Sequence, residues 1–561
     1  MKTYAKILAL LVTAGLILLL REIGLTMRLS PARSDVSARK WSNLSHLPVK
    51  TAPSMGIVDN IRRDLYSDFE PSNPVTFIPM SVRQGDDDFT SPNTTKFKLV
   101  KDESDVHDGQ VVIVTIEAYT AQGQRRSEGG DFWYAVMRSS DSKISTAGHV
   151  TDHRNGTYTV YFYAAWSGLA HIDITLVYTS QTIRWLYEFW QIPRRISWRG
   201  IYDHGNNTVK DSRCEMQHLP ASSSDSKCAY AHELALGKTA FVCDASPEHC
   251  GNLAMTQGNL TRLNEKAEQI LKGHEHLFSR EYLMQKLENG PNSIRIKANQ
   301  VAAKRQYEEN LPSCGSKLRL PVVTGYWTGD TWHSLICKLQ RWEKAPMTKV
   351  KECLRGKDMY FLGDSTTRQF SNVVVELVGM VALLQRRHAA RTYRRVEDPA
   401  YNISFTFQHH PWAVGGSPYP INEVRFEGDV IDSLHESQCN YVVLVGPYAH
   451  YTSWTRADYI ERLQRLREAL VRLKTRCPNS SIFIKGSKPR DHAAFISYIH
   501  SNDFFLYEMN KLMKKVFQGI GATFLDVWDM NLSYLAPNNI HMPMEVIRQE
   551  VNLFLSYLCH T

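Results

Sequence analysis

A serine at the end of an apolar run is the first residue in this sequence whose position suggests chemistry. The stretch "MYFLGDSTTRQF", residues 359–370, passes from apolar residues through Gly363, Asp364 and Ser365 into a polar segment that can form a helix. A serine exposed in a tight turn after a strand can serve as a nucleophile. Asp and Ser also cap helices, because their side chains accept hydrogen bonds from the first free backbone N–H groups. The local sequence supports either reading.

Two histidines could supply the base that a serine nucleophile needs. His541 lies in "PNNIHMP", between the last strand pattern and the C-terminal helix, and His450 lies in "VGPYAHYTSW", after another apolar run. His450 is a rival base, or a group that contacts the oxyanion or the substrate. Either histidine alone is better explained as a structural residue. Polar loops that follow three strand patterns favour the catalytic reading.

The elements around these loops alternate between strands and helices. Short apolar runs at 359–363, 441–446, 481–486 and 522–527 predict strands, and helical patterns follow Ser365 and cover 456–474, 502–518 and 544–558. This alternation predicts an α/β domain over residues 314–561, with a parallel sheet covered by helices. Ligands of such sheets bind beyond the carboxyl ends of the strands, which is where the polar loops would lie.

The residues before this block have the texture of an antiparallel β protein. Runs rich in β-branched and aromatic residues at 110–119, 131–139, 156–166 and 170–179 predict strands of a β-sandwich over residues 91–200. Asn155-Gly156 between two strand patterns predicts a hairpin turn. Residues 29–90 lack periodicity and predict a stem. The polar residues 201–313 hold four closely spaced cysteines and predict a disulfide-stapled connector.

The N-terminus predicts entry into the secretory pathway. Lys2 and Lys6 precede an apolar run from Ile7 to Leu20, so residues 1–28 predict a signal anchor or a signal peptide. No small-residue cleavage site follows Leu20, which favours an uncleaved anchor with its basic end in the cytosol. A cleaved signal and a secreted protein is the alternative. In both cases the rest of the chain would be luminal or extracellular.

Cysteines and glycosylation sequons agree with that compartment. An even number of cysteines without a C-x-x-C pair favours disulfides over metal ligands, and their pairing stays open; they are Cys214, Cys228, Cys243, Cys250, Cys314, Cys337, Cys353, Cys439, Cys477 and Cys559. N-glycosylation sequons occur at Asn43, Asn93, Asn155, Asn206, Asn259, Asn402, Asn479 and Asn531. The formal charge of +9 arises from 66 basic and 57 acidic residues scattered among one another, so a nucleic-acid partner is not expected.

The motifs together resemble a known family. "GDSTTRQ", "GPYAHY" and "NNIHMP", in that order, resemble the PC-esterase branch of the SGNH (GDSL-type) hydrolase fold, which includes glycan O-acyl esterases and O-acetyltransferases. With the N-terminal segment, "GGDFWYAVM", "GHVTDHRNGTYTVYF", the clustered cysteines and "GYWTGDTW", nearly everything after residue 100 resembles the neurexophilin and PC-esterase domain (NXPE) family. The resemblance implies an immunoglobulin-like (filamin- or neurexophilin-type) β-sandwich followed by a three-layer SGNH-type domain.

The resemblance also implies roles for individual residues. Ser365 would be the nucleophile and His541 the general base, and the Ser365 N–H and Gly446 would form an oxyanion hole. Arg368 would orient the turn or hold a substrate carboxylate; a locally paired surface residue is the alternative. Asn538 stands where the wider fold has Asp, so it can orient His541 but not stabilise it by charge. A Ser-His dyad, or a carboxylate from Asp526 or Asp529, is then the other arrangement.

The implied function is acyl transfer on glycans. We expect a luminal carbohydrate O-acetyltransferase or O-acetyl esterase acting on glycoprotein glycans, sialic acid among them, with no metal and with an acyl donor such as acetyl-CoA if it is a transferase. The expected location is the Golgi lumen, as a type II anchored protein, or outside the cell, with membrane contact only through the N-terminal segment. The alternative is a non-catalytic glycoprotein that binds a cell-surface receptor through its neurexophilin-like domain.

Overall fold

The structure is a computed structural model of the chain. It describes residues 89–100, 106–205, 209–218, 227–258, 263–298, 310–315, 318, 321–380, 392–415, 417–490, 495–536 and 539–559. The predicted N-terminal signal or anchor lies outside the described residues, as does the predicted stem apart from Phe89 and Thr90. Among the residues that are described, none of the helices is both long and apolar enough to span a bilayer.

Two antiparallel sheets enclose the first core. One has the strand order β1 (Lys96–Leu99), β2 (Val111–Glu117), β6 (Thr157–Tyr163) and β5 (His149–Asp152). In the other, β13 (Gln285–Lys286) and β14 (Ser293–Ile296) pair with β7 (Gly168–Tyr178), which is followed by β3 (Phe132–Ser139), β4 (Ile144–Ala147), β15 (Gly325–Thr328) and β16 (Thr331–Ser334). Apolar side chains from both sheets form one cluster.

The alternation of residues explains these strands. In β2, Val112, Val114 and Ile116 are buried while the residues between them are more exposed, as a strand with one face on a core requires. The predicted strands at 110–119, 131–139, 156–166 and 170–179 are confirmed as β2, β3, β6 and β7. The predicted hairpin is confirmed too, because β5 and β6 pair on either side of Asn155-Gly156. The immunoglobulin-like topology stays a prediction.

The polar middle of the chain forms a third antiparallel sheet, which the sequence analysis did not foresee. Its order is β10 (Cys228–Ala231), β11 (Thr239–Cys243), β9 (Val209–His218), β8 (Trp198–Asp203), β12 (Leu253–Gly258) and β20 (Tyr419–Pro420). Sheet pairing therefore crosses the expected domain boundaries at 200 and 314. Strand β8 begins before residue 200 but belongs to the third sheet. Strands β13 and β14, from the expected connector, pair in the sheets around the first core, and so do β15 and β16, which lie beyond residue 314. Charged residues along β9 hid its strand character.

All ten cysteines form disulfides, so that prediction is confirmed. The pairs are Cys214–Cys243, Cys228–Cys250, Cys314–Cys337, Cys353–Cys559 and Cys439–Cys477. The first two pairs lie in and beside the third sheet, whose Trp198, Phe241 and Leu253 also belong to a hydrophobic cluster. Fully paired cysteines are typical of proteins that mature in an oxidising compartment such as the secretory pathway.

The C-terminal block contains the predicted parallel sheet. The strand order is β18 (Tyr393–Asp398), β19 (Ile403–His409), β17 (Asp358–Gly363), β21 (Tyr441–Gly446), β22 (Ser481–Lys485) and β23 (Ala522–Leu525). All neighbours are parallel except β18 and β19. The chain passes from β17 to β18 and β19 on one side of β17 and then crosses to β21 on its other side, so the direction in which strands are added reverses beside β17. The carboxyl end of β17 is therefore the point at which such sheets bind ligands.

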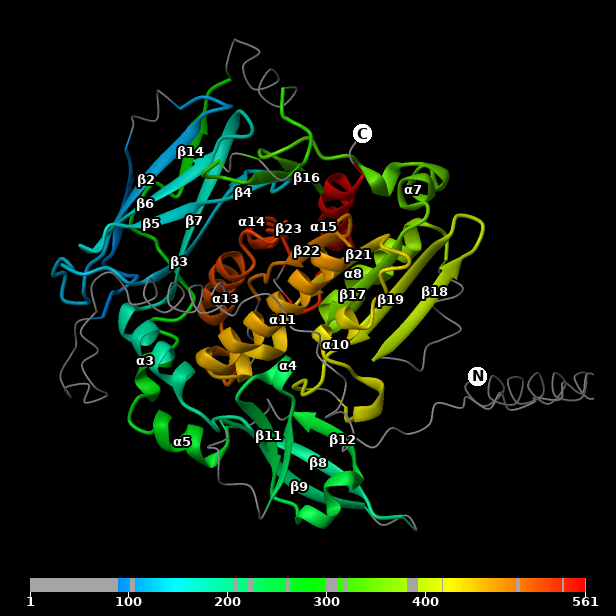
Figure 1. Cartoon of the computed structure of the whole chain (residues 1–561). Coiled ribbons are helices and arrows are strands. Elements are labelled where there is room, and N and C mark those ends of the chain that lie inside the picture. Colours follow the sequence, from blue (N-terminus) through cyan, green and yellow to red (C-terminus); the bar gives the residue numbers. More distant parts are fainter. Residues whose placement is uncertain are drawn as a thin grey trace, which may run out of the picture. The chain divides into compact units, whose positions relative to one another are not determined.

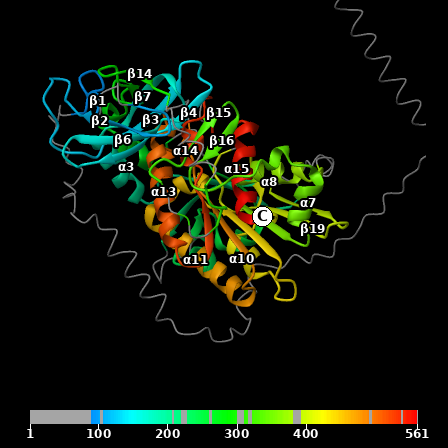
Figure 2. The same ribbon diagram turned by 90° about the horizontal axis from the view of Figure 1, so that it is seen from above.

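Helices cover both faces of this sheet (Figures 1 and 2). On one face α8 (Ser365–Leu377) and α15 (Met544–Leu558) pack with Val442 and Leu444 of β21. On the other face α10 (Glu427–Asp432), α11 (Arg456–Arg476) and α13 (Asp503–Val516) pack with Val443 and Val445. Alternate residues of one strand thus enter two cores, which gives the three layers that the sequence predicted.

Candidate active site

The turn between β17 and α8 answers the question of which residue caps the helix. Asp364 is the N-cap, and its Oδ1 accepts hydrogen bonds from the Thr366 N–H at 2.8 Å and the Thr366 hydroxyl at 2.7 Å. Ser365 is the first helical residue, and its side chain is partly exposed whereas Asp364 is buried. The cap is thus supplied by Asp364, which leaves the Ser365 hydroxyl available for chemistry.

Two glycines allow the start of α8 to sit directly across the strand ends. Gly363 and Gly446 face each other as the last residues of β17 and β21. A Cβ atom on either glycine would lie 2.5 Å from Oγ1 of Thr367, too close for any larger residue while Thr367 keeps its place. The predicted oxyanion residue Gly446 therefore lies beside the turn that carries Ser365. An oxyanion bound there would also lie at a helix N-terminus, which favours negative charge.

His541 is brought to the predicted nucleophile. Its Nε2 lies 2.9 Å from Oγ of Ser365, although the two residues are 176 positions apart in the chain. Partial burial lowers the pKa of His541 from its usual 6.5, Lys488, Arg368 and Arg490 lower it further, and Asp364 opposes them. The imidazole is therefore neutral at physiological pH and can accept the proton of Ser365, which is the arrangement that a general base requires.

His450 occupies a different environment at the same edge of the sheet. It lies in the 3-10 helix η7 (Ala449–Ser453), and its ring centroid is 5.5 Å from that of His409 and 5.1 Å from that of His410. Burial, and then the neighbouring His410, hold the pKa of His450 well below its usual value. Burial likewise lowers the pKa of His410 to about 3. Such neutral histidines are poor proton acceptors, so the geometry favours His541 as the base.

The other predicted site residues differ in what the structure says of them. Arg368 lies one turn after Ser365 on α8 and is close enough to affect the pKa of His541. Asn538 lies outside the described residues. The alternative carboxylates have other partners: Asp526 Oδ2 is 2.6 Å from Nζ of Lys514, and Asp529 Oδ2 accepts a hydrogen bond from Thr324.

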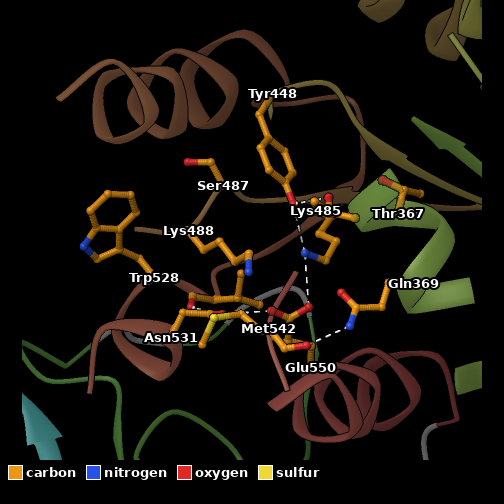
Figure 3. A network of polar contacts seen from close by, with 12 residues as sticks. Thr367, Gln369, Tyr448, Lys485, Ser487, Lys488, Trp528, Asn531, Met542 and Glu550 are labelled. Atoms are coloured by element: carbon orange, nitrogen blue, oxygen red, sulfur yellow. Dashed lines mark hydrogen bonds and ion pairs between the residues drawn. The ribbon is translucent and has the colours of Figure 1, made fainter. Parts of the chain in front are cut away.

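A buried polar chain supports the nucleophile turn, and Figure 3 shows its Tyr448, Lys485 and Glu550. Lys485 Nζ lies 3.1 Å from Oε2 of Glu550 and donates to the Tyr448 hydroxyl at 3.2 Å. The Tyr448 hydroxyl is 2.6 Å from Oγ1 of Thr366, which in turn donates to Asp364. All five residues are at most 2% exposed. The buried polar chain fixes Thr366 and, through it, Asp364, the two residues on either side of Ser365.

Sequence reasoning missed the buried polar chain and also missed His409 and His410. The signal for Lys485 and Glu550 was present, since each is a charged residue at an otherwise apolar position of a strand or helix, and buried charges need partners. His409 ends β19, a fully buried strand that went unpredicted, and His410 follows it. A continuous run of buried residues has no alternation by which to recognise it.

The glycosylation predictions divide by exposure. Asn93, Asn155, Asn402 and Asn479 are exposed, which is consistent with a glycan, whereas Asn43, Asn206 and Asn259 lie outside the described residues. Asn531 is a correction: it is fully buried, and its amide donates to the Val527 carbonyl and to Glu550. This fold leaves no place for a glycan on Asn531, because its nitrogen is part of the core.

Known proteins match this chain in two regions. A family model described as NXPE family member 4-like, C-terminal domain, matches residues 332–559, and a model described as Neurexophilin matches residues 74–219. Among solved structures, a putative GDSL-like lipase from Parabacteroides merdae ATCC 43184 matches 36% of this chain and 97% of its own, with 14% sequence identity and a TM-score of 0.24. With these two domains in this order, the chain belongs to the neurexophilin and PC-esterase domain (NXPE) family.

Proposed function

We propose that this protein transfers acyl groups on glycans through a covalent intermediate on Ser365, as a carbohydrate O-acetyltransferase or O-acetyl esterase. The observation that carries the proposal is the 2.9 Å distance between Ser365 Oγ and His541 Nε2. This pair lies at the carboxyl end of β17, beside which the direction of strand addition reverses, and α/β sheets bind their ligands at such a point. The match to the NXPE4-like C-terminal domain covers both residues.

The chemistry follows from the positions of these groups. Ser365 Oγ attacks the acetyl carbonyl carbon of the donor while His541 Nε2 accepts the hydroxyl proton. The negative charge on the carbonyl oxygen is stabilised at the start of α8 and beside Gly446. The donor's leaving group departs with the proton held by His541, which leaves acetyl-Ser365. A sugar hydroxyl or water then attacks the acetyl carbon and gives its proton to His541. The bond between the acetyl carbon and Ser365 Oγ breaks, His541 returns the proton to Oγ, and the acetylated sugar or acetic acid is released.

Two arginines favour an anionic substrate. Arg368 and Arg490 both lower the pKa of His541, although the buried Asp364 opposes them, and their positive charges favour a negatively charged group. A sialylated glycan has such a group, and so does an acyl donor such as acetyl-CoA. The neutral form of His541, which these charges also favour, is the form that removes the serine proton.

The proposed setting is the secretory pathway. All ten cysteines are paired, which favours an oxidising lumen, and we place the protein in the Golgi lumen, as a type II anchored protein, or outside the cell. Its substrate there would be a glycan or glycoprotein. Asn93, Asn155, Asn402 and Asn479 are exposed and are proposed to carry glycans.

A second function is favoured by the match of residues 74–219 to Neurexophilin. In this alternative the antiparallel sheets bind a cell-surface receptor and the C-terminal block is a scaffold. The test that separates the two functions is mass spectrometry of cell-surface glycans from cells expressing wild type or Ser365→Ala at matched levels. A Ser365-dependent gain of O-acetyl groups identifies a transferase, and a Ser365-dependent loss identifies an esterase. Identical glycans in cells rich in sialylated and mucin acceptors would favour the receptor-binding alternative.

Ser365→Ala is suitable for this test because it removes little stability. Asp364 supplies the helix cap, so we expect the melting temperature of Ser365→Ala to stay within about 2 °C of wild type. Asp364→Ala should instead lose about 0.5–2 kcal/mol. Differential scanning fluorimetry measures both, and a larger loss for Ser365→Ala would mean that the serine has a structural role.

A further inference from the structure

The loop that carries His541 is held by its backbone. His541 itself is exposed, whereas the next residue, Met542, is 1% exposed and packs in the core beside α8 and α15. An exposed imidazole has little packing to fix it. Its distance from Ser365 therefore depends on how firmly the backbone on either side is held.

Gln369 holds the backbone after His541. It lies four residues after Ser365 on α8, so both side chains project from the same side of the helix. Its Nε2 donates to the Met542 carbonyl at 2.7 Å, and the same nitrogen is 3.9 Å from the sulfur of Met544. Figure 3 shows the Gln369 amide directed at Met542. The helix that carries the nucleophile is thus tied directly to the loop that carries the base.

Lys488 holds the backbone before His541. It follows β22 at the same edge of the sheet and is 3% exposed. Its Nζ donates to the Asn539 carbonyl at 2.8 Å. Burial lowers the pKa of Lys488 to about 7, which agrees with an amine directed into the protein and away from water. The carbonyls of Asn539 and Met542, on either side of His541, therefore each accept a hydrogen bond from a different element.

We propose that Gln369 and Lys488 are positioning residues for the acyl-transfer reaction, which hold the His541 loop so that Nε2 stays within hydrogen-bond distance of Ser365 Oγ. This inference rests on the proposed function. Each residue acts through a carbonyl of the loop, Gln369 through that of Met542 and Lys488 through that of Asn539. A displacement of about 1 Å in such a pair lowers the rate about 100-fold.

The test uses a readout of serine activation that needs no knowledge of the substrate. A fluorophosphonate probe reacts with a serine hydroxyl that a base has activated, and peptide mass spectrometry locates the adduct. We expect Gln369→Leu to slow labelling of Ser365 about 10- to 100-fold with little change in melting temperature. The matched control is Gln464→Leu, because Gln464 is a half-buried glutamine of α11 whose Nε2 makes no hydrogen bond to any described residue. It should label at the wild-type rate.

Lys488 provides the second arm and its conservative variant. Lys488→Met removes the donor and should slow labelling about 10-fold or more, while Lys488→Arg keeps a donor and should recover most of the rate. If Gln369→Leu is not secreted, the inference is tested by the labelling rates of the two lysine variants. Faster labelling of Ser365 in Lys488→Arg than in Lys488→Met supports it, and equal rates contradict it. Equal rates for wild type, Gln369→Leu and Lys488→Met would overturn the inference. Wild type that is never labelled at Ser365 would instead contradict the proposed function, so the two failures are distinguishable.

Discussion

Two histidine–hydroxyl contacts in this molecule look alike in isolation. His541 Nε2 lies 2.9 Å from Oγ of Ser365 in the C-terminal domain, and His153 Nε2 lies 2.7 Å from Oγ1 of Thr159 in the first antiparallel sheets. Both imidazoles are exposed. The shorter contact joins residues six positions apart beside one hairpin, whereas the other joins residues 176 positions apart.

The surroundings separate the two contacts. Ser365 lies at a helix N-terminus, beside the paired ends of β17 and β21, above a buried polar chain that ends at Asp364. Thr159 lies within β6, an antiparallel strand that pairs on both sides. Only the first hydroxyl therefore has a place for a developing oxyanion. A short distance between a histidine and a hydroxyl does not by itself make a catalytic pair.

The largest expected effect comes from removing each imidazole in turn. His541→Gln should lower kcat for acyl transfer about 1,000-fold, because general base catalysis contributes 10²–10⁴-fold, with little change in melting temperature. His153→Gln is the matched control and should leave kcat unchanged. Steady-state kinetics on a glycan or ester substrate measure both. A similar loss in both variants, or none in His541→Gln, would remove the distinction between the two contacts.

A second difference lies in the ion pairs near each contact. Lys485 and Glu550, beneath the Ser365 turn, are 1% and 0% exposed, whereas Lys98 and Glu117, in the sheet that holds Thr159, are 67% and 25% exposed. Glu550→Gln leaves a buried charge without its partner and should lower the free energy of unfolding by about 3–5 kcal/mol. Lys98→Met should change it by about 1 kcal/mol or less. Urea unfolding compares the two; equal losses would contradict a structural role for the buried chain.

The smallest expected effect is on the acid limb of the pH–rate profile. Catalysis needs neutral His541, and the pKa of His541 is lowered from 6.5, by burial first and by Lys488, Arg368 and Arg490 after it. Activity should therefore persist below pH 6.5 and fall as the pH drops through that lowered pKa. Arg368→Gln removes one of the cations that lower the pKa of His541, so the limb should move toward higher pH. A limb that moves toward lower pH would contradict this account of the charges.

The elements that position the site were largely predictable from the sequence. The strands before Ser365 and His450 and the last strand before His541 are short apolar runs between helices, and this pattern reports a parallel sheet directly. The order of the strands then brings polar loops to one edge. For that reason Ser365 and His541 could be proposed together, although they are far apart in the chain.

The parts that could not be predicted depend on tertiary contacts. The sheet formed by β8 to β12 is stapled by Cys214–Cys243 and Cys228–Cys250, and its strand β9 consists largely of charged and polar residues. Gln369 and Lys488 are ordinary helix and loop residues until the fold places the His541 loop beside them. The burial of Asn531 likewise follows from its contact with Glu550, which no sequon pattern reveals.

The most direct test of the central claim is to trap the acyl-enzyme. Purified protein is incubated with an activated acetyl ester, quenched in acid and digested, and the peptides are examined by mass spectrometry. We predict an acetyl group on Ser365 in the wild type, at strongly reduced levels in His541→Gln and at wild-type levels in His153→Gln. Acetylation that is absent from Ser365, or equal in wild type and His541→Gln, would contradict the claim that this pair performs acyl transfer.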